Sequence, residues 1–369
     1  MHAAIALNLD SVGLRAAMRL LQAGEVDAAE WTYDNLHAAA DVPTWFTDLV
    51  AHFAQAGRLY GHGVFFSLFD GRWTREQDRW LRSLRALARR FPLRHVTEHF
   101  GFLSGADFHR GAPLSPPMDE RALRLGTDRL RRIADAAGCP AGVENLALAF
   151  SHEDVYRQGA FLAELTAATD GLLVLDLHNL YCQAHNFDVP ADELLAAYPL
   201  ERVRELHLAG GSWRESDTEP GRRIRRDTHD GTVPEEVWAL LDEALARCPQ
   251  LELALLEQVP QALTTAAGAE AYRADFRRMR RRIQSPESTP APSPAPPPPA
   301  LPPLPEAPLS DERLYAEQRA LVRVLAEAPT PHAALERLRA SSLAEAGWDT
   351  GRWDVSMVET AMDLVKTWG

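Results

Sequence analysis

Residues 201–211 read ERVRELHLAGG, and this stretch carries the first information about fold and function. Its central run, 203–208, alternates as a β-strand does, and successive side chains of a strand point to opposite faces. Glu205 and His207 therefore share one face of a mostly apolar strand that ends just before Ala-Gly-Gly. An acid and an imidazole on one strand face indicate either a solvent-exposed face or a functional site. The pattern of the other strands distinguishes these two interpretations.

Seven further short apolar runs have the length of strands, and amphipathic helical stretches lie between the runs. The runs cover residues 5–9, 28–33, 59–68, 94–100, 141–146, 172–177 and 251–257, and the clearest helical patterns cover 73–91 and 234–248. This alternation predicts a parallel sheet with helices outside it. Eight strands in about 250 residues have the size of a (β/α)₈ TIM barrel, which is the predicted α/β fold. A doubly wound open sheet is the alternative, but no Gly-rich phosphate loop follows the first run.

A proline-rich segment divides the chain. We expect a barrel domain over residues 1–284, an extended polyproline linker over 285–309 and a small helical domain over 310–369. Ser310 is the expected N-cap of the first tail helix, whose apolar stripe consists of Leu314, Leu321, Val324 and Leu325. A second helix is expected from Pro331 to Gly347 and a third from about Asp354 to Trp368. The tail carries no cluster of catalytic residue types, which favours a role in recognising a peptide or a partner.

Composition limits the function. The formal net charge of −13 disfavours nucleic acid as a partner, because nucleic-acid binding rests mainly on Lys and Arg contacts to phosphates. No apolar run is long enough to predict a membrane span, and the N-terminus shows no pattern of a secretion signal. The three cysteines form no zinc-ligand pair and no disulfide framework, so a reducing cytoplasm is expected. The basic run 222–226 is expected in a loop, where it either faces solvent or holds an acidic peptide or a carboxylate.

Acids or imidazoles end nearly every predicted strand, and in a barrel these ends meet at one mouth. Each residue alone is more often a core histidine or a solvated rim acid. Burying them together is costly unless something compensates their charge, and metal cations do so. One ion with an open position needs three or four protein ligands, so the larger set predicts two or three ions of Fe, Mn or Zn. The candidate ligands are His62, His99, Glu144, Asp176, Glu205, His207, Asp227, His229 and Glu257. The candidates for orienting them are Glu98, Asn145, His178 and Asn179, whereas Cys182 is expected to be a core filler.

These residues lie in stretches that resemble the DUF692 (UPF0276) family of multinuclear non-heme iron-dependent oxidases. The matching stretches are VGLR near the start, GHGVFFSL, TEHFGF, VENL, LDLHNLYCQAHNFD, RVRELHLAGG, DTHDGTVPEEVW and LLEQ, in this order along residues 1–284. The resemblance implies a barrel that holds two or three irons, uses O₂ and modifies a ribosomally made precursor peptide, often at a cysteine. It also implies that a separate partner protein can recruit the peptide. The nine candidate ligands fall where the family's motifs place its metal ligands.

Two departures from the family pattern have consequences. The family often has two asparagines after the Asp of the sixth strand, where this chain has His178 and Asn179, so His178 is either an added ligand or a residue that changes metal occupancy. The linker and the helical tail are not part of the family's core domain, and we expect the tail to replace or dock the recruiting partner or the peptide leader. Two other functions stay open at this stage. One is a divalent-metal barrel of the sugar isomerase or endonuclease IV kind, and the other is a non-catalytic, metal-dependent peptide-binding module.

Overall fold

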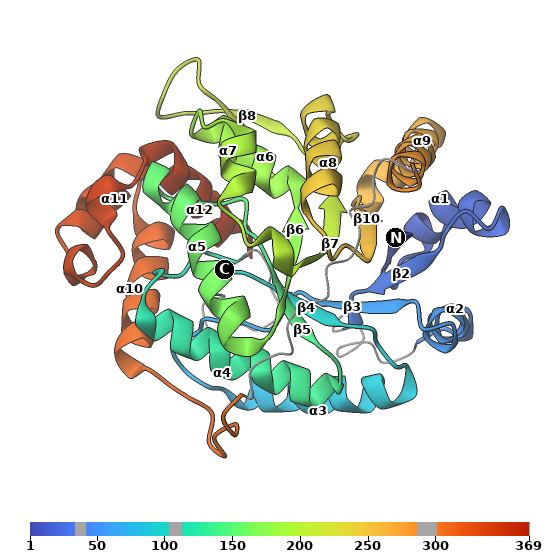
Figure 1. The fold of residues 1–369 in the computed structure, drawn as a ribbon. Helices are drawn as coiled ribbons and strands as arrows, with labels where there is room; N and C mark the ends of the chain where they lie inside the picture. Colours follow the sequence, from blue (N-terminus) through green and yellow to red (C-terminus); the bar gives the residue numbers. More distant parts are fainter. Residues whose placement is uncertain (34–41, 103–112, 286–300, 369) are drawn as a thin grey trace.

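The protein is described by a computed structural model that covers residues 1–33, 42–102, 113–285 and 301–368. Its centre is a closed barrel of eight parallel strands (Figure 1). The barrel strands are β1 (His2–Leu7), β2 (Ala28–Trp31), β3 (Leu59–Gly63), β4 (Val96–His99), β5 (Ala141–Glu144), β6 (Leu172–Asp176), β7 (Val203–Leu208) and β10 (Leu253–Leu256). Each falls within or overlaps one predicted run, and β1 pairs with both β2 and β10, so the sheet has no edge. The predicted (β/α)₈ barrel is therefore confirmed.

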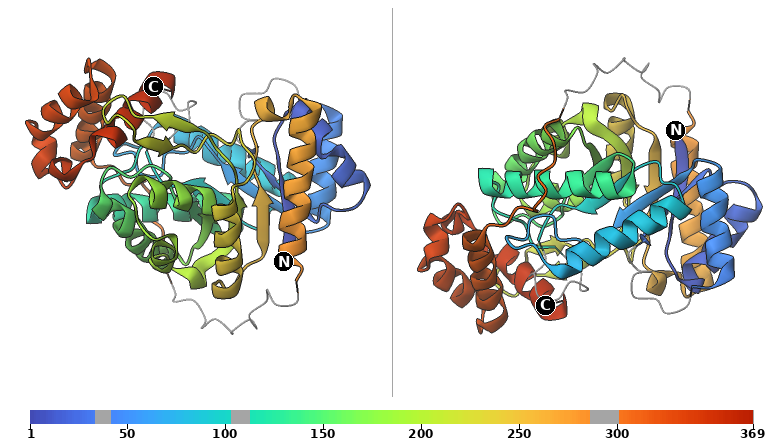
Figure 2. Two further views of the ribbon diagram at one scale, coloured as in Figure 1. Left: turned by 90° about the horizontal axis from the view of Figure 1, so that it is seen from above. Right: turned by 90° about the horizontal axis from the view of Figure 1, so that it is seen from below.

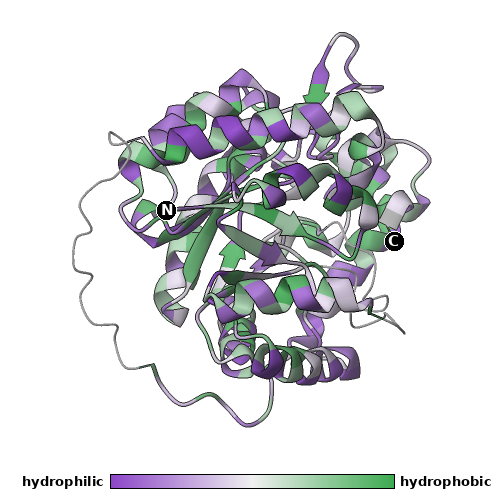
Figure 3. Cartoon of the chain, turned by 90° about the vertical axis from the view of Figure 1, so that its right-hand side faces the viewer, coloured by the Kyte–Doolittle hydropathy of each residue, from purple (hydrophilic) through white to green (hydrophobic). Residues whose placement is uncertain are grey.

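Helices surround the barrel, and Figure 3 shows mostly hydrophobic strands and helices that carry both hydrophobic and hydrophilic residues. They are α1 (Ser11–Gln22), α2 (Thr44–Gln55), α3 (Arg75–Arg90), α4 (Glu120–Ala137), α5 (His152–Thr169), α6 (Leu177–Asn186), α7 (Ala191–Ala196), α8 (Glu235–Arg247) and α9 (Ala266–Ile283). The start of α3 shows how local sequence sets a helix boundary. Thr74 and Gln77 form a capping box, in which each side chain accepts a hydrogen bond from the other residue's backbone N–H.

The basic run 222–226 is only partly a loop. Residues Arg223–Arg225 form β9, which pairs antiparallel with β8 (Trp213–Glu215) after β7. Its arginines are occupied within the chain: Arg222 forms an ion pair with Asp354, and Arg226 donates a hydrogen bond to Ser212. The contacts of Arg222 and Arg226 thus help to hold the ribbon of β8 and β9 in place.

The tail consists of α10 (Glu312–Glu327), α11 (Pro331–Arg339) and α12 (Val355–Trp368), which lie beside α4 and α5 at one side of the barrel (Figures 1 and 2). Two expectations for the tail were wrong. Asp311 is the N-cap of α10, because its carboxylate accepts from the backbone N–H of Leu314, while the Ser310 hydroxyl accepts from the N–H of Trp73. The second helix ends at Arg339, and the short 3₁₀ helix Ser342–Glu345 follows it.

The tail packs tightly on the barrel. Gln318 of α10 bridges two backbone groups after β3: its amide nitrogen donates to the Phe69 carbonyl at 2.7 Å, and its oxygen accepts from the Gly71 N–H at 2.8 Å. The indole of Trp353, just before α12, stacks on Phe150 with ring centroids 3.9 Å apart. The apolar stripe of α10 is buried at Leu314, Leu321 and Leu325, and Val324 is half-buried.

Other parts of the predicted organisation are described only partly. Much of the predicted linker lies outside the described residues. Its end contacts α4, where Arg132 donates a hydrogen bond to the Pro305 carbonyl. The domain boundaries at 284 and 309 stay a prediction. Among the described residues, no helix has both the length and the apolar character that a membrane crossing requires.

Candidate metal centre

The barrel interior gathers carboxylates and imidazoles from most of its strands. Glu205 and His207 of β7 are both fully buried, and register pairs His207 with Asp176 of β6 and His99 of β4 with Glu144 of β5. Ligand atoms within 4.8 Å of one another define four overlapping groups that could hold a metal ion. The groups are His62–His99–Glu144, Glu144–Asp176–His207, Asp176–His229–Glu257 and Glu30–Glu205–His207.

The first group presents two imidazoles to one carboxylate oxygen. Nε2 of His62 and Nε2 of His99 lie 3.3 Å and 3.5 Å from Oε2 of Glu144. Nδ1 of His99 donates to the Gly63 carbonyl, because a carbonyl only accepts. Nδ1 of His62 lies 2.8 Å from the hydroxyl of Thr97. That hydroxyl donates to the Gly61 carbonyl at 3.3 Å and therefore accepts from His62. Both rings thus keep the lone pair of Nε2 for the centre, the usual arrangement of a ligating histidine.

The middle group connects the other three. Oε1 of Glu144 lies 3.3 Å from Nδ1 of His207, so the two oxygens of Glu144 face different groups. Asp176 is shared as well, because it belongs both to this group and to the one with His229 and Glu257. A carboxylate between two such groups is suited to bridging two ions.

The third group lies at the mouth. Nδ1 of His229 is 3.4 Å from Oε2 of Glu257, and Nε2 of His229 is 2.8 Å from Oδ1 of Asp227. Asp227 is in contact with His229 and with Nδ1 of His178 at 3.0 Å, and it stands outside the four groups. His178 is likewise in none of them.

Two residues of the cluster were missed or undervalued in the sequence. Glu30 lies in β2, 3.4 Å from Nε2 of His207, yet it stood outside the nine candidates. His95 immediately precedes β4, and its Nε2 lies 2.6 Å from Oε2 of Glu205. The sequence could have indicated His95, because residues 95, 97 and 99 of a strand share one face and His99 was already a candidate ligand.

The candidates for orienting ligands lie next to them. Asn145 holds the backbone of Asp176 from both sides, accepting from its N–H at 2.7 Å and donating to its carbonyl at 3.1 Å. The N–H of Asn179 donates to Oδ1 of Asp176. Glu98 is buried against Gly63, where a Cβ would come 1.8 Å from Oε1 of Glu98, so a larger residue there would displace the Glu98 carboxylate.

The electrostatics of the centre are those of opposing buried charges. Burial alone would raise the pKa of Glu144, but His207, His99 and His62 outweigh burial and lower that pKa to about 2. Burial and the nearby His99 lower the pKa of His62 to about 3. For Asp176, burial and the neighbouring Asp227 and Glu144 raise the pKa well above its ordinary value. In the protein without metal, some carboxylates thus favour their charged form and others their neutral form.

The residues present fit a metal cluster. Several buried ligand atoms have no hydrogen-bond partner among the described residues, including Oδ2 of Asp176, Oε2 of Glu144 and both ring nitrogens of His207. Buried polar atoms that make no hydrogen bond are rare in native proteins and costly to maintain. A set of imidazole nitrogens and carboxylate oxygens without thiolate suits Fe, Mn or Zn.

The centre opens into a cavity of about 650 Å³ that the tail helps to form. His62, His99, His229 and Glu257 lie at its base, and the tail helix α12 forms part of its wall. The residues of α12 that line it are Met357, Thr360, Asp363, Leu364 and Thr367. The tail, expected only as a recognition module beyond a linker, therefore reaches the mouth of the barrel.

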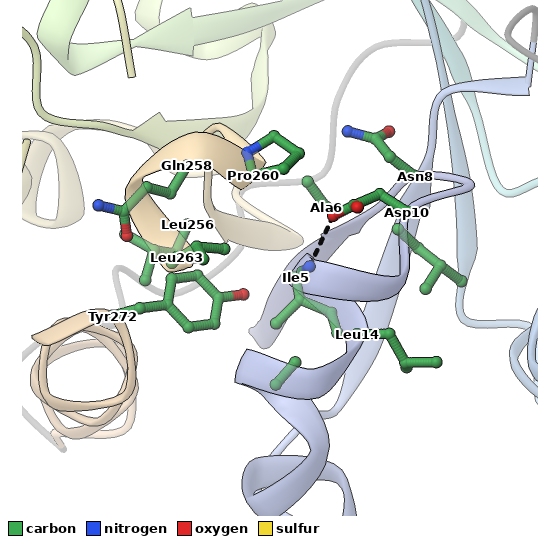
Figure 4. Close-up of a pocket in the computed structure, with 13 residues that line it drawn as sticks. Ile5, Ala6, Asn8, Asp10, Leu14, Leu256, Gln258, Pro260, Leu263 and Tyr272 are labelled. Carbon is green, nitrogen blue, oxygen red and sulfur yellow. Dashed lines mark hydrogen bonds between the residues drawn. The ribbon is translucent and has the colours of Figure 1, made fainter. Parts of the chain in front are cut away.

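A second cavity adjoins this one at Asn8 and is much smaller. Figure 4 shows its lining from β1 and the start of α1, from the end of β10 and from Tyr272 of α9. Its volume of about 30 Å³ is too small for a substrate. Asn8 lines both cavities.

Helix α12 is fixed to the ribbon beside the mouth by a polar network. The Glu359 carboxylate accepts from the Ser216 hydroxyl at 2.9 Å and from the Asp217 N–H at 3.1 Å, and it forms an ion pair with Arg214 at 2.9 Å. Arg214 also pairs with Asp363 at 2.6 Å. Because Glu359 is buried, this network fixes the position of α12 relative to the centre.

Comparison with known proteins identifies the family. A family model described as "RiPP precursor modification enzyme MbnB/TglH/ChrH" matches residues 12–273. The chain belongs to this family. Its relatives include proteins named UPF0276 from Caulobacter vibrioides (34% identical over 170 residues), Acaryochloris marina (34% over 190) and Bordetella pertussis (35% over 188). The matched regions cover 46%, 50% and 50% of this chain, and the chain spans 58%, 64% and 63% of the length of these relatives.

Solved structures resemble the barrel more distantly. An L-ribulose 3-epimerase is 14% identical with a TM-score of 0.49, over 77% of this chain and 97% of that protein. Endonuclease IV from Thermus thermophilus is 16% identical with a TM-score of 0.44, over 75% of this chain and all of that protein. Likenesses of this size carry no argument about function. Membership of the family agrees with the resemblance that the strand-end motifs indicate.

Proposed function

We propose that this protein is an O₂-dependent oxidase that binds two or three iron ions in the barrel and modifies a ribosomally made precursor peptide, with cysteine as the expected target. The observation that carries the proposal is the chain of overlapping groups at the base of the large cavity, in which Glu144, Asp176 and His207 each belong to two groups. One mononuclear site would not need such sharing. Family membership supports a peptide as the substrate.

The nine predicted ligands keep this role in the proposal, and the structure suggests Glu30 as a tenth candidate. His62, His99 and Glu144 would hold one ion, Glu144, Asp176 and His207 a second, and Asp176, His229 and Glu257 a third. Asp227 would add an oxygen ligand beside His229, and Glu205 would add one beside Nε2 of His207. Bound iron would supply the redox chemistry with O₂ that side chains of the protein lack.

The chain's own residues would position the ions and control access to them. Thr97 and the Gly63 carbonyl fix the imidazoles of His62 and His99 with Nε2 toward the centre. Asn145 and Asn179 hold Asp176 in place. Glu205, His207 and Asp176 are fully buried, whereas His62, His99, His229 and Glu257 line the cavity, so we expect substrate to approach from the cavity.

The cavity suits one side chain of a peptide together with its neighbours. Its volume of about 650 Å³ exceeds what a single cysteine fills, and its lining is mixed, with the apolar Leu146 and Leu148 and the charged Arg226 and Asp363. Because α12 forms one wall, we propose that the tail recognises the residues that flank the target, with or without a separate recruiting protein. The chain's unpaired cysteines agree with action in the cytoplasm.

The recognition role of α12 has a direct test. Leu364→Ala removes an apolar side chain from the cavity wall, and Lys366→Ala, at an exposed position of the same helix, is the matched control. In a synthetic pool of cysteine-containing peptides, we expect Leu364→Ala to change which peptides the iron-loaded enzyme consumes, while Lys366→Ala leaves the choice unchanged. The same peptide preferences in Leu364→Ala and in the wild type would contradict this role.

The metal proposal is tested by elemental analysis of protein purified without oxygen. Two or more irons per chain, with O₂ consumption when the peptide pool is added, would support the oxidase. Stoichiometric zinc or manganese with little iron would instead favour an isomerase or hydrolase. No bound metal after anaerobic reconstitution would refute the metal centre. Metal without O₂ consumption in the presence of peptides that bind would favour a binding module.

A further inference from the structure

His178 occupies an unusual position directly beside the candidate centre. It lies in the first turn of α6, two residues after Asp176, and its side chain is fully buried. Nε2 of its ring lies 3.1 Å from Nε of Arg225, and Nδ1 lies 3.0 Å from Oδ1 of Asp227. The imidazole therefore stands between a cation from β9 and a carboxylate of the mouth.

The chemistry of these neighbours fixes the proton on the ring. A guanidinium group has donors only, so Nε2 of His178 must accept the hydrogen bond from Arg225. The neutral ring then carries its hydrogen on Nδ1, and this N–H donates to Asp227. Oδ1 of Asp227 also meets Nε2 of His229 at 2.8 Å. Both contacts use Oδ1, so the second oxygen of Asp227 takes part in neither.

Arg225 is itself held rigidly. Its backbone N–H donates to Oδ1 of Asn186 at 2.8 Å, and the Asn186 amide donates back to the Arg225 carbonyl at 3.0 Å. Its guanidinium lies over Trp213, 5.0 Å from the ring centroid. Gly211 leaves room for the imidazole, because a Cβ there would come 2.8 Å from Cε1 of His178. The sequence thus builds a place for this histidine from three separate segments.

We infer that Arg225 and His178 are positioning residues, which by fixing one tautomer of the imidazole orient the Asp227 carboxylate toward the metal group of Asp176, His229 and Glu257. The inference rests on the proposed metal centre. It assigns His178 a role other than that of a ligand, because His178 stands outside the groups of ligand atoms and both of its ring nitrogens are engaged. Residues that orient a ligand typically change metal affinity about 10- to 100-fold when they are replaced.

Two substitutions of His178 should differ in effect, because one keeps a hydrogen-bond donor for Asp227 and the other removes it. The side-chain nitrogen of asparagine is one bond beyond Cγ, as Nδ1 of histidine is, so His178→Asn keeps a donor for Asp227. His178→Leu keeps the bulk and removes the donor. Arg225→Met keeps much of the apolar stem and frees the ring to take the other tautomer. His185→Asn is the matched control, because His185 lies on the same helix and its ring contacts only the Arg223 carbonyl among the hydrogen-bond partners described.

The first measurement is metal binding by the full chain, titrated anaerobically with Fe²⁺ alone and, separately, with Co²⁺ alone. We expect His178→Leu to weaken one ion about 10- to 100-fold and to leave the others unchanged. His178→Asn and His185→Asn should stay within about threefold of the wild type. Arg225→Met should weaken the same ion as His178→Leu, and the double variant should lose no more than the stronger single variant, because both act through one contact. Unchanged affinity in His178→Leu, or equal losses in the Leu and Asn variants, would overturn the inference.

A second measurement does not depend on metal. In the ¹⁵N spectrum of the metal-free chain with labelled histidine, the signals lost in His178→Asn identify His178. We expect its hydrogen on Nδ1 in the wild type and a changed tautomer balance in Arg225→Met. A hydrogen on Nε2 in the wild type would overturn the inference. A wild-type chain that binds neither Fe²⁺ nor Co²⁺ would refute the metal centre, while the tautomer would still show whether Arg225 sets the ring.

Discussion

Replacing Gln318 by leucine should destabilise the whole protein, although it makes helix α10 more apolar. In the wild type, the buried amide of Gln318 satisfies the Phe69 carbonyl and the Gly71 N–H of the barrel at 2.7 Å and 2.8 Å. Leucine leaves both backbone groups buried without this partner, and each such group costs about 1–3 kcal/mol. The added apolar surface of leucine offsets roughly 1 kcal/mol of that loss. We expect the free energy of unfolding to fall by about 3 kcal/mol.

The assay is urea unfolding of the full chain, followed by circular dichroism and by tryptophan fluorescence. Arg323→Leu is the control, because it makes a comparable change at an exposed position of the same helix and should alter stability by less than about 0.5 kcal/mol. If the tail is docked as described, both probes should report the loss together. An unfolding free energy for Gln318→Leu within about 0.5 kcal/mol of the wild type would refute the contact between α10 and the barrel.

Three further outcomes follow from the geometry. Burial raises the pKa of Asp70 from 3.8 to about 6, so the folded protein holds that proton more tightly than the unfolded chain does. The stability that this proton contributes is present below pH 4 and is lost as the pH rises through 6. Asparagine does not titrate, so the unfolding free energy of Asp70→Asn relative to the wild type should rise by up to about 3 kcal/mol from pH 4 to pH 7.5. Urea unfolding at both pH values measures this change. Glu144→Gln should lower metal content by more than one ion per chain and Glu257→Gln by one ion, measured by elemental analysis after anaerobic loading, because Glu144 belongs to two groups and Glu257 to one. Equal losses would contradict the bridging role. Trp353→Ala removes the stack on Phe150 and should lower the unfolding free energy by about 3–5 kcal/mol, a result that thermal and urea denaturation can check.

The barrel was predictable because its signals are local and repeated. Each strand is a short apolar run, and the polar residue at its end is adjacent in sequence, so the order of strands alone brings His62, Glu144 and Asp176 to one mouth. Their common location follows from topology and needs no knowledge of side-chain rotamers. What they bind is a separate question that the chemistry of the donors narrows to a metal.

Other features depended on contacts that no local pattern contains. Ser310 and Asp311 are both residue types that favour the N-cap position. Asp311 occupies it, because the Ser310 hydroxyl accepts a hydrogen bond from the backbone N–H of Trp73, which is distant in sequence. The pairing of Arg225 with His178 could not be foreseen either, since a basic run looks the same whether it meets solvent or a buried ring. Likewise, the amphipathic pattern of α12 shows that it packs, and only the fold shows that it packs at the mouth of the barrel.

Because α12 is covalently joined to the barrel, the presence of the cavity wall that it forms does not depend on protein concentration. A wall supplied by another subunit would be present only in proportion to that subunit's concentration and affinity. A wall joined by a linker is present at an effective concentration that the length and stiffness of the linker set, and it is always matched one to one with its site. Dilution therefore leaves the cavity's shape unchanged. The contacts of α12 with Arg214 and Ser216 can then be modest in strength and still hold α12 at the mouth of the barrel.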